Sequence, residues 1–267
     1  MSARKRLVPP TIPSPQFLMT QASDPVSDFF AERQADIAAM GKDEELRQKS
    51  LDWMLHADKY KYTYNYTWMG RPIIKYPNDM VAQQELMWML KPDLVIETGI
   101  AHGGSIIFSA SMMEMMGIEG EVVGVDIDIR EHNRSEIESH PMMKRITMIE
   151  GSSTDPAVFE KVCAKAAGKR CVMVILDSLH SHQHVYDELQ LYPKLVTVGS
   201  YLLLPDTFIE HFPKGYYSGN RPWDVGDNPM TAMRKFLAEN DDFVIDQEID
   251  NKLMITEGMQ SYLRRVK

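Results

Sequence analysis

The stretch "DLVIETGIAHGGSIIFSASMM", from Asp93 to Met113, decides the fold of this chain. It opens with a short apolar run that is typical of a buried strand, and it closes with a longer apolar run of helical length. Between the two runs stand three glycines, Gly99, Gly103 and Gly104. A strand that only packs a core has no need of such a loop. We therefore expect the loop to let a ligand approach the backbone at the start of the helix.

Outward from this stretch, short apolar runs alternate with helical ones. The strand-like runs are "DLVIETG", "EVVGVDI", "ITMIEG", "CVMVILDS" and "SYLLLPDT". Helical stretches are expected between them, at 104–116, 134–140, 155–167 and 182–196. Continuously apolar strands that alternate with helices predict a parallel sheet covered on both faces.

The end of the chain departs from this alternation. After a helix at "NPMTAMRKFLAEN" come the runs "FVIDQEI" and "KLMITEG", joined by Asp250 and Asn251, a pair that fits a tight hairpin. A dinucleotide-binding sheet has two matching halves instead. We therefore predict an α/β, Rossmann-like fold with a seven-stranded, mostly parallel sheet and a terminal antiparallel hairpin. This is the layout of the class I S-adenosylmethionine (SAM) methyltransferases.

Composition excludes several classes of protein. The chain has 267 residues, 44% hydrophobic and 25% charged, with a net charge of −9 and a pI near 5.4. This acidity argues against nucleic-acid and anionic-membrane partners. We also predict no membrane-spanning segment and no secretory signal. Cys163 and Cys171 are the two cysteines, too few for a disulfide framework. We expect a cytoplasmic protein.

The region before Asp93 is expected to form an extension. Residues 28–58 read as one or two amphipathic helices broken near Gly41, and Asp79 as the N-cap of a helix over 79–90. The aromatic segment 59–76 is either a loop packed on the domain edge or a lid over the substrate. The predicted parts are a flexible arm at 1–27, a helical and aromatic extension at 28–78 and the catalytic domain at 79–267.

The glycine loop differs from a dinucleotide fingerprint. It has the form E-x-G-x-x-x-G-G, so Glu97 stands where the first glycine of G-x-G-x-x-G would be. SAM has no pyrophosphate to cradle, and Glu97 can bind its amino group. A loop shaped by packing alone is the alternative. The candidate cofactor-binding residues of the first three strand ends are Glu97, Gly99, His102, Gly103, Gly104, Ser105, Asp126, Ile127, Ser152 and Ser153.

Asp126 ends the second strand, where a carboxylate can accept both ribose hydroxyls. Asp128 is either a further polar contact or a solvated loop charge. Ser152 and Ser153 follow the third strand, at the level of the adenine. They are as well suited to cap a helix as to bind the base.

Asp177 and Asp206 follow the fourth and fifth strands. Two carboxylates on adjacent strand ends suit Mg²⁺, which could lower the pKa of a substrate hydroxyl. His180 and His182 are candidate bases, with His180 the better placed; His184 is expected on the following helix. Without a metal, Asp177 could orient the histidine instead. An iron site is a weaker reading, because the i, i+2 spacing of histidines on a helix points the rings apart.

Several segments in order resemble one known family. They are "NYTWMGRPIIKYP", "VIETGIAHGGS", "VVGVDIDIR", "IEGSS", "LDSLHSHQHVYDELQLYPKLVTVGSYLLLPDT" and "NPMTAMRKFLAEN". Over about residues 62–257 the chain resembles the cephalosporin hydroxylase / rhamnosyl O-methyltransferase family. The resemblance implies a SAM-dependent methyltransferase fold and a Mg²⁺ held after the fourth and fifth strands, at Asp177 and Asp206. Members can carry Glu-Asp where this chain has Pro205 and Asp206, so one expected ligand is missing.

The function expected from these observations is SAM-dependent O-methylation of a hydroxyl on a sugar, a sugar-bearing natural product or a glycolipid, with assistance from Mg²⁺. An NAD-dependent sugar oxidoreductase or epimerase and a non-catalytic partner with the same fold are the alternatives. The aromatic segment and the loop at 208–227 are expected to close over the acceptor. The N-terminal extension and the 20 methionines predict a homo-oligomer.

Overall fold

The computed structural model describes residues 24–217, 219 and 221–267. Residues 1–23 of the arm predicted at 1–27 lie outside the described residues. The described residues divide into two compact units, residues 24–36 and 37–267. The described part of the first unit belongs to helix α1 (Pro25–Met40). The helix begins with a proline, whose fixed φ suits the first helical position. Residues 25–27 are therefore helical, although we predicted them to be part of the arm.

The second unit begins with the end of α1 and continues through helix α2 (Glu44–Asp58). The two helices are separated at Gly41 and Lys42, as the sequence predicts. The Asp43 side chain caps α2 by accepting a hydrogen bond from the backbone N–H of Leu46 at 2.9 Å. The aromatic segment then forms a 3₁₀ turn and a small antiparallel hairpin of β1 (Tyr66–Trp68) and β2 (Arg71–Ile73).

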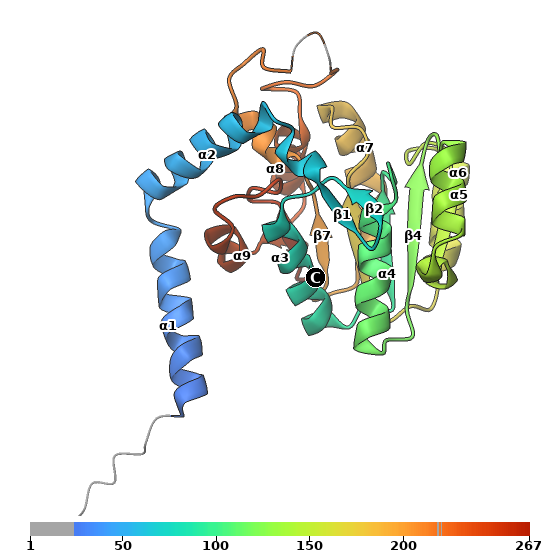
Figure 1. Cartoon of the computed structure of the whole chain (residues 1–267), viewed down its shortest axis with the longest axis horizontal. Helices are drawn as coiled ribbons and strands as arrows, with labels where there is room; N and C mark the ends of the chain where they lie inside the picture. Colours follow the sequence, from blue (N-terminus) through green and yellow to red (C-terminus); the bar gives the residue numbers. More distant parts are fainter. Residues whose placement is uncertain (1–23, 218, 220) are drawn as a thin grey trace, which may run out of the picture. The chain divides into compact units, whose positions relative to one another are not determined.

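Within the described residues, seven strands form the main sheet, in the order β5-β4-β3-β6-β7-β9-β8. Figure 1 labels β4 and β7 of this sheet. Every pair is parallel from β5 to β7, and β9 runs antiparallel to both of its neighbours. Six strands therefore point one way and one is reversed, which confirms the predicted layout. The strands are β3 (Leu94–Thr98), β4 (Glu121–Asp126), β5 (Ile146–Glu150), β6 (Val172–Leu176), β7 (Tyr201–Leu203), β8 (Phe243–Ile245) and β9 (Tyr262–Arg265).

Helices cover both faces of this sheet, and alternate strand residues serve the two faces. Leu94 and Ile96 belong to one apolar cluster, together with α6, α7 and α8. Val95 belongs to the other cluster, together with α3, α4 and α9. The helices are α3 (Pro77–Leu90), α4 (Gly104–Met116), α5 (Glu131–Glu138), α6 (Pro156–Ala166), α7 (His182–Leu191), α8 (Pro229–Glu239) and α9 (Gln247–Lys252). Residues of β3 and β6 are buried throughout, as their apolar sequences predict.

The terminal hairpin is present, but its second strand is not where we predicted it. Asp250 and Asn251 lie in helix α9, and the reversed strand is β9, Tyr262–Arg265. The helix forms because the Asp246 side chain accepts hydrogen bonds from the backbone N–H groups of Glu248 and Ile249. An N-cap aspartate therefore overrides the apparent turn pair, and the strand follows a longer connection.

Helix α3 also begins differently from the prediction. It starts at Pro77 with Tyr76 at the N-cap, so Asp79 lies inside the first turn. The Asp79 side chain is 3% exposed and binds groups near the end of the chain. Over the described ranges, none of the helices is both long and apolar enough to cross a membrane.

Candidate functional site

A cavity of about 570 Å³ lies at the carboxyl edge of the sheet, where β3, β4, β6 and β7 end. Most of the residues that the sequence singles out line it: Glu97, Gly99, His102, Gly104, Ser105, Asp126, Ile127, Ser152, Ser153, Asp177, His180 and Asp206. Gly103 and His182 lie outside it. The strand ends that we treated one by one therefore meet in a single pocket.

The glycines of the loop serve the protein's own packing. Gly99 has a φ of +88°, and a Cβ there would meet the backbone oxygen of Asp177 at 1.9 Å. A Cβ on Gly104 would meet the backbone oxygen of Pro72 at 2.2 Å, and one on Gly103 would meet the Ile137 side chain. The tight turn at Gly99 is as predicted. All three glycines therefore have a role in packing, and Gly99 and Gly104, which also line the cavity, remain candidate ligand contacts.

Asp126 is bound to the glycine loop. Its Oδ2 accepts hydrogen bonds from the backbone N–H groups of Ile100 (2.8 Å) and Ala101 (3.2 Å), and its Oδ1 accepts one from that of Asp128 (3.1 Å). Asp128 itself points to solvent, with a side chain 73% exposed. Asp126 thus holds β4 and the loop after β3 in one arrangement, in addition to its predicted contact with a ribose.

Two side chains that the sequence reading missed support the loop from outside. The buried Asn133, on α5, donates from Nδ2 to the backbone oxygen of Ala101, a non-glycine residue with a φ of +45°. Arg71, on β2, donates to the backbone oxygen of His102 and to Asn133 Oδ1, each at 3.0 Å. Because these contacts come from separate elements, the loop shape depends on tertiary packing as well as on its glycines.

Glu97 is a buried acid at the end of β3. It is 1% exposed, and its Oε2 has no hydrogen-bond partner in the part of the chain that the structure describes. Burial raises the pKa of this carboxyl to about 7; nearby Lys75 lowers it and Asp177 raises it further. A buried acid with an unsatisfied oxygen is suited to receive a cationic donor from a ligand.

Ser153 and His184 form the cavity wall beyond β5. His184 Nε2 lies 3.2 Å from Ser153 Oγ and 3.0 Å from Ser178 Oγ, and Ser178 in turn donates to the buried Glu188. His184 is on α7, as predicted, and lines the cavity. Neither serine caps α6, because Asp155 does so instead. Ser152 and Ser153 thus remain candidate ligand contacts.

Asp177, His180 and Asp206 form a potential metal site. Each offers one ligand atom, and these atoms lie within 4.8 Å of one another. His180 Nε2 is 3.2 Å from Asp206 Oδ2, so Asp206 is the partner of this histidine, and our alternative that Asp177 orients it is wrong. Asp206 adopts the left-handed conformation with a φ of +60°, which is uncommon for a non-glycine residue. Burial raises the pKa of Asp206.

His182 occupies a different place. It starts α7, its Nδ1 lies 2.8 Å from Thr231 Oγ1, and its backbone N–H donates to Asp227. These contacts connect α7 to α8 outside the cavity. Among the predicted histidine bases, His180 is therefore the one that can face a ligand.

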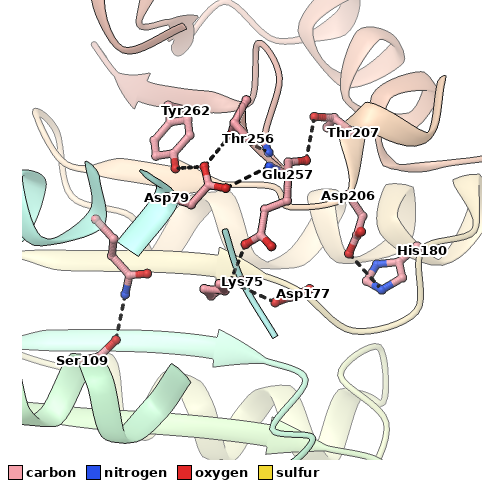
Figure 2. A network of polar contacts seen from close by, with 12 residues as sticks. Lys75, Asp79, Ser109, Asp177, His180, Asp206, Thr207, Thr256, Glu257 and Tyr262 are labelled. Atoms are coloured by element: carbon pink, nitrogen blue, oxygen red, sulfur yellow. Dashed lines mark hydrogen bonds and ion pairs between the residues drawn. The ribbon is translucent and has the colours of Figure 1, made fainter. Parts of the chain in front are cut away.

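Lys75 and Glu257 are the main residues that the sequence reading missed. Lys75 follows β2, is 3% exposed and lies 3.2 Å from Asp177 Oδ2 and 2.7 Å from Glu257 Oε1 (Figure 2). A lysine inside the apolar run "RPIIKYP" was a visible signal, because buried lysines need charged partners. No local signal marks Glu257, which comes near Asp177 only through the path of the chain after α9.

Carboxylates outnumber cations at this end of the cavity. Glu97, Asp177, Asp206 and Glu257 line it, and the ammonium of Lys75 is the one lysine charge among the described lining residues. Burial of charge without compensation is unfavourable. The donor set thus fits a hard divalent cation and also a positively charged organic ligand.

The aromatic segment and the loop after β7 line the remaining part of the cavity. Tyr64 comes from the first, and Tyr217, Arg221 and Trp223 come from the second. The Trp223 ring packs edge-on against His180, with ring centroids 4.7 Å apart. Both segments predicted to cover an acceptor therefore line the cavity, and the loop after β7 packs against His180 through Trp223.

Known proteins resemble this chain over most of its length. The family model Rhamnosyl O-methyltransferase/CmcI matches residues 60–266. The chain is 32% identical over 208 residues to a rhamnosyl O-methyltransferase of Mycobacterium bovis (strain BCG / Pasteur 1173P2), with 74% of this chain and 78% of that protein covered. It is 35% identical over 162 residues to the Mycobacterium leprae (strain TN) rhamnosyl O-methyltransferase, covering 60% and 68%.

A solved structure described as cmcI-D160 Mg-SAM has a similar fold. The TM-score is 0.55 at 22% identity, and the match covers 76% of this chain and 78% of that one. At this identity the likeness concerns the fold.

Proposed function

This chain belongs to the Rhamnosyl O-methyltransferase/CmcI family, and on that premise we propose that it is a SAM-dependent O-methyltransferase acting on a hydroxyl of a sugar, a glycolipid or a sugar-bearing natural product. The observation that carries the proposal is one cavity that joins Glu97 and Asp126 to the Asp177–His180–Asp206 group. A cofactor and an acceptor can meet there.

In this proposal the cofactor half of the cavity holds SAM, which supplies a methyl group on a positively charged sulfur. Asp126 accepts hydrogen bonds from the ribose hydroxyls, and the buried Glu97 binds the ammonium group. Ser152 and Ser153 contact the adenine. His102, Ser105 and Ile127 line the same half. The excess of buried carboxylate stabilises a ligand that carries positive charge.

The other half positions the acceptor and receives its proton. When His180 is neutral, its Nε2–H donates to Asp206, and Nδ1 is left to take the proton of the hydroxyl. The Trp223 ring packs against the His180 ring and fixes the orientation of the imidazole. The reaction is an in-line displacement, so alignment of the hydroxyl oxygen with the methyl carbon provides much of the acceleration.

Asp177 and Asp206 would hold a Mg²⁺ ion in this half, with His180 beside them as the base. The ion would act as a Lewis acid that lowers the pKa of the acceptor hydroxyl. The carboxylate oxygens fit this hard cation, although Pro205 stands where family members can carry a further acidic ligand.

The test is a methylation screen of sugar and glycoside acceptors with labelled SAM, with and without Mg²⁺, and with heat-denatured protein as control. A methylated product seen by mass spectrometry supports the proposal. Calorimetry separates the alternatives: binding of NAD but not SAM would favour an oxidoreductase, and binding of neither would favour a non-catalytic partner.

Helix α3 has three exposed apolar side chains, Val81, Trp88 and Met89. Together with the composition, these side chains agree with a homo-oligomer. Light scattering at micromolar concentration tests this, and a monomer would contradict it. A cytoplasmic location is the further expectation from composition.

A further inference from the structure

Lys75 holds one carboxylate of the candidate metal site. Its ammonium lies 3.2 Å from Asp177 Oδ2 and 2.7 Å from Glu257 Oε1, and its side chain is 3% exposed (Figure 2). One of the two oxygens of Asp177 is thus already bound to a cation that belongs to the protein. His180 and Asp206, the other members of the site, bind each other instead.

Buried residues hold Glu257, the partner of this ammonium, in place. Asp79, on α3, accepts hydrogen bonds from the Glu257 backbone N–H (2.9 Å), the Tyr262 hydroxyl (2.9 Å) and the Thr256 hydroxyl. All four of these residues are buried. Glu257 is therefore held in place by α3 and β9, and it holds Lys75 in turn. No ligand is needed to place the ammonium next to Asp177.

Lys75 also stays charged. Its ammonium contacts the Asp177 carboxylate at 3.2 Å and the Glu257 carboxylate at 2.7 Å, and two adjacent carboxylates favour the charged form of a buried lysine. A fixed positive charge beside Asp177 repels a second cation and competes with it for the same carboxylate.

We propose that Lys75 is a built-in cation that sets how strongly the Asp177–His180–Asp206 group binds a divalent metal ion. Lys75 is a positioning residue: it holds Asp177 in place before a metal or an acceptor arrives, and it weakens metal binding by occupying Asp177 Oδ2. This inference rests on the proposed function for the identity of the metal site, but its test is the binding of Mg²⁺ alone.

The decisive variant exchanges both members of the ion pair, Lys75→Met with Glu257→Gln. The exchange removes one positive and one negative charge, so the net charge of the cluster does not change. If only net charge matters, Mg²⁺ affinity stays at the wild-type value. If the ammonium competes for Asp177, affinity rises by about tenfold. Calorimetric titration of the full chain with MgCl₂, without SAM or acceptor, measures the difference.

A single variant gives the opposite sign. In Glu257→Gln, Lys75 keeps its charge but loses its closest partner, so it binds Asp177 more strongly and Mg²⁺ affinity falls, by about threefold to tenfold. Unchanged Mg²⁺ affinity in this variant overturns the proposal even if the double variant does not fold.

The matched control is Gln83→Leu with Ser109→Ala. This pair is also buried and hydrogen-bonded, at 2.8 Å, and it connects α3 to α4. Its removal should leave Mg²⁺ affinity at the wild-type value. A rise equal to that of the Lys75 and Glu257 exchange would mean that loosening of α3, and not the ammonium, controls the site, and would overturn the proposal.

Failure of this inference can be told from failure of the proposed function. Wild-type affinity in the double exchange, or a wild-type chain that does not bind Mg²⁺, overturns the role of Lys75 while methyl transfer from SAM can still be measured. Tighter Mg²⁺ binding in the double exchange supports that role whether or not any tested acceptor is methylated.

Discussion

The two halves of the cavity are built in different ways. Around Gly99 and Asp126 the wall is backbone: a glycine close to the Asp177 carbonyl oxygen, and a carboxylate that accepts hydrogen bonds from backbone N–H groups. Around Asp177 the wall is charged side chains, and its neighbours Lys75 and Glu257 come from distant parts of the chain. The first half is determined by steric fit and the second by electrostatics.

This difference separates the expected effects of substitution. A change in the backbone-built half should alter folding or cofactor affinity, because the wall itself moves. A change in the charged half should alter the rate of methyl transfer while the cofactor still binds. Substitutions test whether the two halves are independent in this sense, and those at Asp177, Gly99 and Asp126 are each compared with a similar residue outside the cavity.

The largest effect is expected in the charged half. Asp177→Ala removes a carboxylate next to the acceptor position and should lower the rate of methyl transfer by about 10²- to 10⁴-fold. Calorimetry should find SAM affinity near the wild-type value. Asp187→Ala, an exposed acid on α7, is the control and should keep the full rate. Full turnover by Asp177→Ala with a true acceptor would place the chemistry elsewhere.

Two further measurements identify how Asp177 acts. If it holds Mg²⁺ together with Asp206, a chelator should abolish transfer, and added Mg²⁺ should restore the chelated wild type but not Asp177→Ala. If the chelator has no effect and His180→Ala is as damaging as Asp177→Ala, base catalysis by the His180–Asp206 pair carries the reaction. His182→Ala should retain the rate, because His182 binds Thr231 outside the cavity.

In the backbone-built half, Gly99→Ala should destabilise the fold. Its Cβ would lie 1.9 Å from the Asp177 backbone oxygen, and alanine disfavours a φ of +88°. We expect a loss of about 3 kcal/mol in the free energy of unfolding, measured by urea denaturation. Gly117→Ala is the control: its φ is also positive, at +65°, but a Cβ there has no heavy atom within 4 Å among the described residues. Equal losses in the two variants would show that φ, and not the contact with Asp177, determines the effect.

What the sequence predicts, and what it does not, follows the same division between the two halves of the cavity. The parallel strands, the presence of one reversed strand and the cavity at Glu97, Asp126 and Asp177 follow from local patterns, because parallel strands bring their carboxyl ends to one edge. Lys75 and Glu257 could not be paired from the sequence, since 182 positions separate them. Their contact depends on β2 and on the segment before β9, whose position we predicted wrongly.

Side-chain caps explain other errors. Asp250 and Asn251 have the residue types of a turn, but the cap at Asp246 makes them helical. Asp79 has the residue type of an N-cap, yet it lies within the first turn of α3 and binds Tyr262. An aspartate near the start of a helix fits the N-cap sequence pattern whether it stands at the cap or inside the first turn. Its actual hydrogen-bond partners come from segments that are distant in the sequence.

Asp126→Ala tests the cofactor assignment. Loss of charged hydrogen bonds to the ribose should weaken SAM binding by about 2–3 kcal/mol in calorimetry. Because Asp126 also holds the loop N–H groups of Ile100 and Ala101, part of this loss is expected to come from a looser loop. Asp128→Ala, two residues on and exposed, should bind SAM as the wild type does. Unchanged affinity in Asp126→Ala would refute the ribose assignment.

The smallest effect concerns pH and Glu97. Burial raises the pKa of this carboxyl to about 7, so in the free protein it is mostly protonated below that pH and mostly ionised above it. A ligand ammonium prefers the carboxylate. SAM affinity should therefore be highest above pH 7 and should fall as the pH drops through 7, by about tenfold between pH 8 and pH 6.

Glu97→Gln isolates this contribution, because the titration of SAM itself is the same in both proteins. The variant should bind SAM more weakly at pH 8, and the ratio of the two affinities should shrink toward pH 6, where the wild-type carboxyl is itself mostly neutral. A ratio that stays constant from pH 6 to pH 8 would mean that Glu97 keeps one protonation state throughout. Any pH dependence of SAM affinity would then come from a group other than Glu97.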